Sequence, residues 1–170
     1  VVQHLRTIDG IDHWPVVGLA AGQNESLLKQ QAVLLGVDAI SLQMDCSSNE
    51  VQVYCGDDAA AEMIRAHAKK GDLVLAAIVG FAGISPVLAA IECGCDIALA
   101  NKECLVAAGE LIMAAAKSAD IRILPVDSEH SAIFQCIENS PSKDIAKVVL
   151  TASGGSLRSM TKQEMATASV

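Results

Sequence analysis

The stretch LVLAAIVGFAGISPVLAAIECGCDIALANKE, residues 73–103, decides the fold. A fully apolar run over 73–79 is followed by a glycine-rich turn, a segment with helical spacing over 84–94, and a second apolar run over 96–100. Short continuous apolar runs indicate strands buried on both faces, as in parallel sheets covered by helices. Pro86 fits the first turn of the intervening helix. The stretch therefore predicts a strand–helix–strand unit of a parallel sheet.

The same alternation extends in both directions along the chain. Further strands are predicted over 15–20, 38–43, 50–56, 122–126 and 146–152, and further helices over 1–8, 25–36, 57–71, 104–118, 131–139 and 161–166. Alternating strands and helices with near-continuous apolar strands are typical of a doubly wound, mostly parallel, Rossmann-like α/β sheet.

Composition excludes several classes of function. The chain has 170 residues, of which 52% are hydrophobic and 2% aromatic, and its net charge is −8. This net charge argues against the basic patch that a nucleic-acid partner needs. No apolar run approaches the ~20 residues of a membrane span, and the first residues lack the pattern of a signal peptide, so we expect no membrane partner.

The six cysteines form no metal or disulfide pattern. They lie at positions 46, 55, 93, 95, 104 and 136, without a CxxC pair. In a chain of this size we expect reduced, partly buried thiols in a reducing compartment.

Polar residues gather directly after the predicted strands. The turns are 22–24, 80–83, 101–103, 127–130 and 153–156. In an open parallel sheet, ligands bind where the carboxyl ends of the strands meet. Each turn alone is explained by helix capping or tight turning, but together they predict a site for a polar ligand.

Asp127 and Glu129 are separated only by Ser128. One interpretation is that Asp127 or Ser128 caps a helix. The other is a site for Mg²⁺ or Mn²⁺, because carboxylates at i and i+2 of an extended chain point the same way and hard cations take oxygen ligands. The same choice stays open for Lys102, as a surface lysine or as the partner of an anionic ligand, and for Ser153, in a tight turn or a phosphate cradle.

The runs ALANKECLVAAGELI, ILPVDSEHSAIFQC and LTASGGSLR resemble the 1-deoxy-D-xylulose 5-phosphate reductoisomerase family, as does AAIVGFAGISPVLAAIECG. The similarity extends from about position 1 to 161. It implies an NADPH- and metal-dependent oxidoreductase and isomerase that makes 2-C-methyl-D-erythritol 4-phosphate in the non-mevalonate isoprenoid route. It also implies that residues 1–126 are an NADPH-binding domain lacking its first strand and glycine-rich loop, and that residues 127–170 begin the catalytic domain.

The resemblance also implies roles for single residues. The implied metal ligands, for Mg²⁺, Mn²⁺ or Co²⁺, are Asp127 and Glu129. The implied substrate contacts are Lys102, Ser128, Glu129 and Ser153, with Lys102 and Glu129 catalytic. The implied cofactor contacts are Gly22, Gln23, Asn24, Asn101 and Glu103.

Three departures from the family pattern stand out: Cys104 in place of serine, Ser156-Leu157 in place of proline-phenylalanine, and Gln23 where a basic residue is frequent. Parts of the family's site would lie outside residues 1–170, so we expect a fragment that is inactive alone. For the complete protein the resemblance implies a homodimer, in a bacterial cytoplasm or, alternatively, a plastid stroma. Two other interpretations stay open: a non-catalytic nucleotide- or metal-binding α/β module, and another NAD(P)-dependent dehydrogenase of the homoserine-dehydrogenase type.

Overall fold

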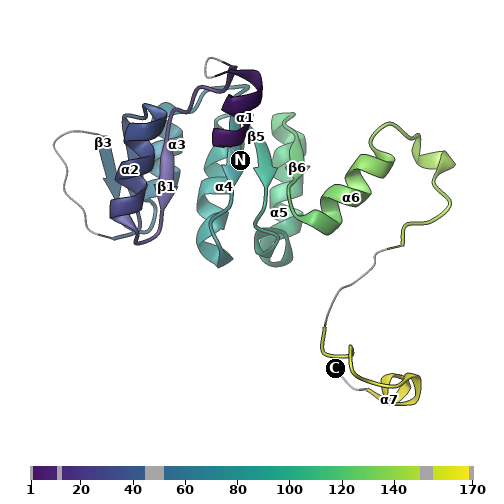
Figure 1. Cartoon of the computed structure of the whole chain (residues 1–170). Coiled ribbons are helices and arrows are strands. Elements are labelled where there is room, and N and C mark those ends of the chain that lie inside the picture. Colours follow the sequence, from purple (N-terminus) through teal and green to yellow (C-terminus); the bar gives the residue numbers. More distant parts are fainter. Residues whose placement is uncertain (1, 11–12, 45–51, 150–154, 169–170) are drawn as a thin grey trace. The chain divides into compact units, whose positions relative to one another are not determined.

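The computed structural model describes residues 2–10, 13–44, 52–149 and 155–168 (Figure 1). The chain divides into two compact units, Val1–Asp127 and Ser128–Val170, which are described separately. The elements of the first unit are α1 (Val2–Asp9), β1 (Leu19–Ala21), α2 (Glu25–Leu35), β2 (Ala39–Leu42), β3 (Gln52–Cys55), α3 (Ala59–His67), β4 (Leu73–Ala76), η2 (Gly80–Gly83), α4 (Ile84–Glu92), β5 (Asp96–Leu99), α5 (Glu103–Ala119) and β6 (Ile123–Pro125).

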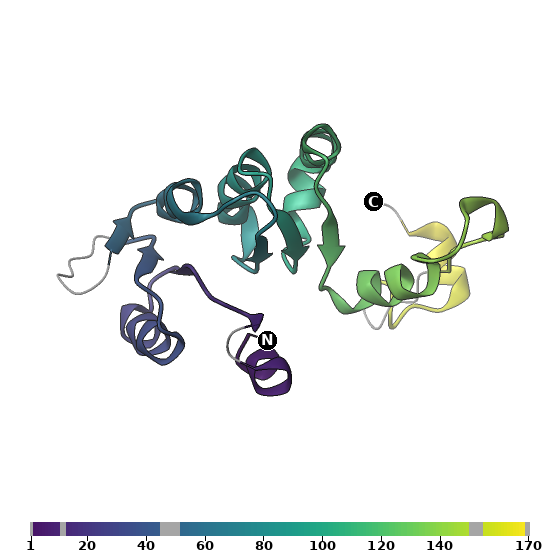
Figure 2. The same ribbon diagram turned by 90° about the horizontal axis from the view of Figure 1, so that it is seen from above.

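The strands of the first unit form two three-stranded sheets, in the orders β1-β2-β3 and β4-β5-β6. Every strand pair in both sheets is parallel, with Val74 opposite Ile97 and Ile97 opposite Ile123 in the second sheet. Seen from above, α3, α4 and α5 lie on one face of the strands and α1 and α2 on the other (Figure 2). The predicted doubly wound parallel α/β fold is confirmed.

Each sheet has its own hydrophobic core. Helices α2 and α3 pack on β2 of the first sheet, and α4 and α5 pack with β5 of the second. In the second sheet, Ile97 of β5 packs with Val87 of α4 and Ile112 of α5, and all three side chains are at most 1% exposed. In the first sheet, Ile40 of β2 packs with Leu28 of α2. Aliphatic side chains build both cores, as the 2% aromatic content requires.

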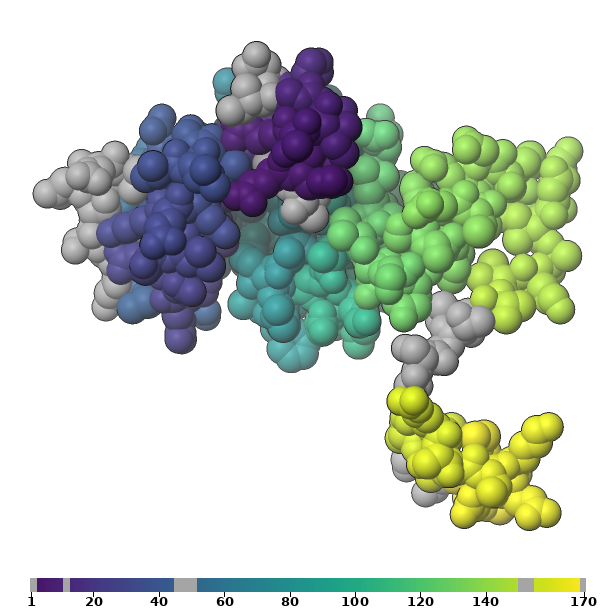
Figure 3. Space-filling view, in the orientation of Figure 1, coloured from purple at the N-terminus to yellow at the C-terminus, as the bar shows by residue number. Residues whose placement is uncertain are grey.

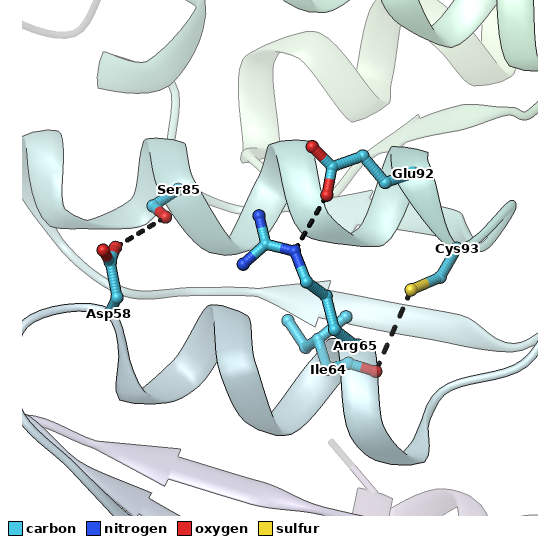
Figure 4. Close-up of polar contacts among 6 residues, drawn as sticks. All are labelled: Asp58, Ile64, Arg65, Ser85, Glu92 and Cys93. Atoms are coloured by element: carbon cyan, nitrogen blue, oxygen red, sulfur yellow. Dashed lines mark hydrogen bonds and ion pairs between the residues drawn. The ribbon is translucent and has the colours of Figure 1, made fainter.

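Helices α3 and α4 pack side by side and are tied by polar contacts near both ends (Figure 4). Ser85 Oγ donates to Asp58 Oδ1 over 2.8 Å, and Arg65 Nε donates to Glu92 Oε2 over 2.9 Å. Because α3 also packs on β2 and α4 on β5, this helix pair links the two sheets.

Helix α1 is held at the C-terminal end of α2, where Arg6 Nη1 donates to the carbonyl of Leu35 over 3.1 Å. Figure 3 shows α1, in purple, on the near face of the first unit. The cation thus lies at the negative end of the α2 dipole, which favours the contact.

The second unit contains α6 (Ser128–Ile137), η3 (Ser142–Asp144) and α7 (Lys162–Thr167). The predicted strand over 146–152 is wrong for residues 146–149, which have no regular structure, and residues 150–152 lie outside the described part of the chain.

Among the described cysteines, Cys93, Cys95, Cys104 and Cys136 are free thiols, whereas Cys55 is disulfide-bonded. The prediction of reduced cysteines is therefore wrong for Cys55. A disulfide requires only that two Cβ atoms approach in space, and spacing along the sequence does not show this.

Candidate functional site

The turns that follow β4, β5 and β6 are joined by hydrogen bonds at the carboxyl ends of these strands, which we call the carboxyl edge. At its far end, Lys102 Nζ lies 3.0 Å from Asp127 Oδ2. The Lys102 side chain is 56% exposed and the Asp127 side chain only 15%. Lys102 immediately precedes α5, so the ammonium group and the positive end of the helix dipole lie at the same point of the edge. The start of α5 thus carries an ammonium group that is paired with the Asp127 carboxylate.

Asn101 forms the other link of the carboxyl edge. Its side-chain nitrogen donates to the carbonyls of Ile78 and Gly80 in the turn after β4, and its oxygen accepts from Cys104 N over 3.3 Å. The residue is 4% exposed. Cys104 packs beneath it without exposure, and burial raises the pKa of the Cys104 thiol. The sequence did not predict that both N–H groups of this amide would donate to backbone carbonyls of the chain.

Glu129 lies in the first turn of α6, because that helix begins at Ser128 rather than at 131 as predicted. The argument from an extended chain at Asp127 and Glu129 therefore does not hold. Ser128 Oγ donates to Glu129 Oε2 over 2.7 Å, and both residues are exposed. Within the described residues, no group of three or more His, Cys, Asp or Glu side chains is arranged to hold a metal.

The carboxyl ends of the first sheet meet in a small cavity. The backbone of Gln43 donates to Gly22 O over 3.0 Å, and its side-chain amide donates to Asp57 Oδ1 over 3.3 Å. These residues line a cavity of about 30 Å³ together with Ile78 of the turn after β4. Ser41 Oγ also lines it, is buried, and has no hydrogen-bond partner among the described residues.

Gly22, Gln23 and Asn24, the predicted cofactor contacts after β1, are all exposed. The Asn24 side chain caps α2 by accepting from Leu27 N over 3.1 Å, so its oxygen has a structural role. Glu103 is the exposed first residue of α5.

Sequence reasoning missed Ser41, Gln43 and Asp57. The turns after β2 and β3 follow strands that were predicted, so applying the same rule to every strand would have found Gln43 and Asp57. No sequence signal marks Ser41, since it lies within β2. The predicted substrate contact Ser153 lies outside the described residues.

Comparison with known proteins identifies the family. The family model of 1-deoxy-D-xylulose 5-phosphate reductoisomerase matches residues 3–109, and the model of that enzyme's C-terminal domain matches residues 123–170. The chain belongs to this family. Reductoisomerases similar to it include that of Allorhizobium ampelinum, 41% identical over 98% of this chain and 43% of the relative, and that of an Exiguobacterium species, 52% identical over 62% and 27%.

Solved reductoisomerase structures share the fold. The Zymomonas mobilis enzyme in complex with NADPH superposes with a TM-score of 0.78 at 34% identity, over 98% of this chain and 46% of the other. A DOX-P reductoisomerase in complex with NADPH, fosmidomycin and magnesium gives a TM-score of 0.72 at 31% identity, over 84% and 36%. The chain spans less than half the length of these reductoisomerases. None of the helices in its described part is long and apolar enough to cross a membrane.

Proposed function

We propose that the chain is part of a reductoisomerase that converts 1-deoxy-D-xylulose 5-phosphate to 2-C-methyl-D-erythritol 4-phosphate with NADPH and a divalent metal ion. The main support is that both regions of the chain match models of this family. The second support is the Lys102–Asp127 pair at the carboxyl edge. In an open α/β sheet this edge is where ligands bind.

Lys102 is the residue we assign to the phosphorylated sugar substrate. Its side chain is 56% exposed and stands at the start of α5, a helix with a kink at Ala108, where an anion is favoured. Asp127 accepts a hydrogen bond from Lys102 Nζ and so holds the ammonium group at the edge. A positioned cation of this kind stabilises negative charge that develops on a substrate oxygen. Ser128, Glu129 and Ser153 are assigned as further substrate contacts from the family pattern, with Lys102 and Glu129 as the catalytic residues.

Asp127 and Glu129 are the residues that would hold the metal ion. The donor set fits Mg²⁺, Mn²⁺ or Co²⁺, since these ions bind through a few carboxylates and complete their shell with water and substrate oxygens. When bound, such an ion polarises a substrate carbonyl. Ser128 Oγ, which donates to Glu129 Oε2, orients that carboxylate. Lys102 and a metal ion would compete for Asp127, so metal binding is coupled to the position of the lysine.

The cofactor is assigned to the turns at the carboxyl ends of both sheets. Gly22 and Gln23 are exposed there, and Gly22 has no side chain that would obstruct a ligand. Asn24 caps the start of α2. Glu103 stands at the start of α5, next to Lys102. When bound, NADPH would supply a hydride, and the role of these residues is to orient the cofactor toward the substrate.

We further propose that the complete protein is a homodimer in a bacterial cytoplasm. The curated relatives named above are bacterial, which supports this setting over a plastid stroma.

A chimera tests the proposed function. Residues 1–170 replace the matched segment of the Zymomonas mobilis enzyme, and NADPH oxidation is followed with 1-deoxy-D-xylulose 5-phosphate and Mn²⁺. We expect turnover that Lys102→Ala abolishes with little change in NADPH affinity, while the 170-residue chain alone is inactive. A folded chimera that binds NADPH without turnover would favour a non-catalytic nucleotide-binding module instead.

A further inference from the structure

We propose that Asn101 is a positioning residue, whose side chain locks the turn after β4 onto the start of α5 instead of contacting the cofactor. The inference deepens the proposed function where it concerns NADPH. Its structural part rests on hydrogen bonds within the chain.

Both donors of the amide are already committed. An asparagine side chain offers two N–H donors and a carbonyl oxygen with two lone pairs. The nitrogen of Asn101 donates to Ile78 O and to Gly80 O, the latter over 2.8 Å. The oxygen accepts from Cys104 N. A ligand could recruit either N–H only by breaking a buried bond to a backbone carbonyl, which leaves that carbonyl unsatisfied.

Close packing keeps the amide in this orientation. A Cβ atom added at Gly83 would overlap Asn101 Nδ2, and it would lie 2.9 Å from Ile78 O and 3.2 Å from Cys104 Sγ. The glycine therefore makes room for the amide, and the turn, the amide and the buried thiol fit together as one unit.

We call Asn101, the turn that it holds and the start of α5 the clamp. The clamp determines which side chains of the carboxyl edge are exposed to solvent. The turn it holds carries Val79 and Phe81, which are 84% and 73% exposed although both are large and apolar. On its other side, Asn101 directly precedes Lys102 at the start of α5. One buried amide thus fixes the position of an apolar turn and of a cation at the same edge.

Hydrogen exchange in the unliganded 170-residue chain provides the first test. The reporters are the amide of Ile84, which donates to Phe81 O at the end of the turn, and that of Cys104. Asn101→Ala should speed exchange at both amides by about tenfold or more, the range expected for a lost buried hydrogen bond. Asn101→Asp keeps the acceptor for Cys104 N but places an oxygen next to two carbonyl oxygens. This variant should therefore speed hydrogen exchange at the Ile84 amide far more than at the Cys104 amide.

The control is Asn139→Asp, which makes the same chemical change at an exposed position of the second unit. It should leave both reporter amides unchanged. Equal exchange at Ile84 in Asn101→Ala and in the unsubstituted chain would overturn the clamp. If the alanine variant does not fold, the aspartate variant provides the test. Equal acceleration of exchange at its Ile84 and Cys104 amides would then overturn the clamp.

A titration with NADPH distinguishes positioning from direct contact. Nuclear magnetic resonance should show backbone amides of Gly80 and Gly83 shifting on NADPH addition, while the side-chain NH₂ pair of Asn101 stays in place. A shift of that pair larger than those of the two glycines would overturn the proposal. Absence of NADPH binding by the chimera described above would count against the proposed function, and the exchange data would still decide whether the clamp exists.

Discussion

Replacing Asp127 with asparagine should separate metal binding from folding. The substitution removes one of two proposed carboxylate ligands and breaks the ion pair with Lys102. That pair is short, with 3.0 Å between Nζ and Oδ2, but the lysine is 56% exposed. Exposed pairs contribute about 0–1 kcal/mol, so the variant should lose only ~2–4 °C in Tm. The affinity for Mn²⁺ should fall on the order of ten- to a hundredfold, since even residues that only orient metal ligands have effects of that size.

The assay is a titration of the 170-residue chain with Mn²⁺, followed by electron paramagnetic resonance of the free ion, with Tm from circular dichroism. The matched control is Glu92→Gln, which removes an equal charge from the exposed Arg65–Glu92 pair, whose atoms lie 2.9 Å apart. The control should show a similar small change in Tm and unchanged Mn²⁺ binding. The ligand assignment fails if Asp127→Asn binds Mn²⁺ as tightly as the unsubstituted chain, or if the control loses as much affinity.

Three further predictions concern the body of the fold. Ile112→Ala should lower the free energy of unfolding in urea by about 2–5 kcal/mol, because the side chain is fully buried; a loss under 1 kcal/mol would contradict this packing. Hydrogen bonds from Arg122 hold the pKa of Asp96 below its ordinary value. The resulting stability is present above pH ~4 and lost as pH falls through the lowered pKa, and Asp96→Asn should abolish this part of the acid dependence. Burial raises the pKa of Cys95 to about 11, so a thiol reagent at pH 8 should label exposed Cys136 quickly and Cys95 only on unfolding; equal rates would refute the assigned burial.

The sequence predicted the parallel sheet because continuous apolar runs such as 73–79 and 96–100 are typical of parallel strands. The second run is buried as β5, whereas Leu73 and Leu75 of β4 are 49% and 40% exposed. It also predicted which turns carry polar residues. It could not predict the hydrogen bonds between those turns, since they depend on the register of neighbouring strands. Asn101 illustrates this limit, because its partners Ile78 and Gly80 lie more than 20 positions earlier in the chain.

The errors have equally physical origins. The β-branched run over 146–152 has strand propensity, but residues 146–149 form no regular structure. Capping and metal binding use the same residue types at a helix start, so the pattern at 127–129 could not show that α6 begins at Ser128. The Cys55 disulfide depends on proximity in space, which spacing along the sequence does not reveal.

Paramagnetic broadening by Mn²⁺ provides the most direct test of the proposed metal and substrate site. The 170-residue chain is labelled with ¹⁵N and titrated with substoichiometric Mn²⁺, using Mg²⁺ as the diamagnetic reference. We predict that the amides of Lys102, Asp127 and Glu129 broaden first and together, and that Asp127→Asn removes the effect. Broadening confined to other acidic segments, or strong broadening at Glu129 with none at Lys102, would contradict a shared site.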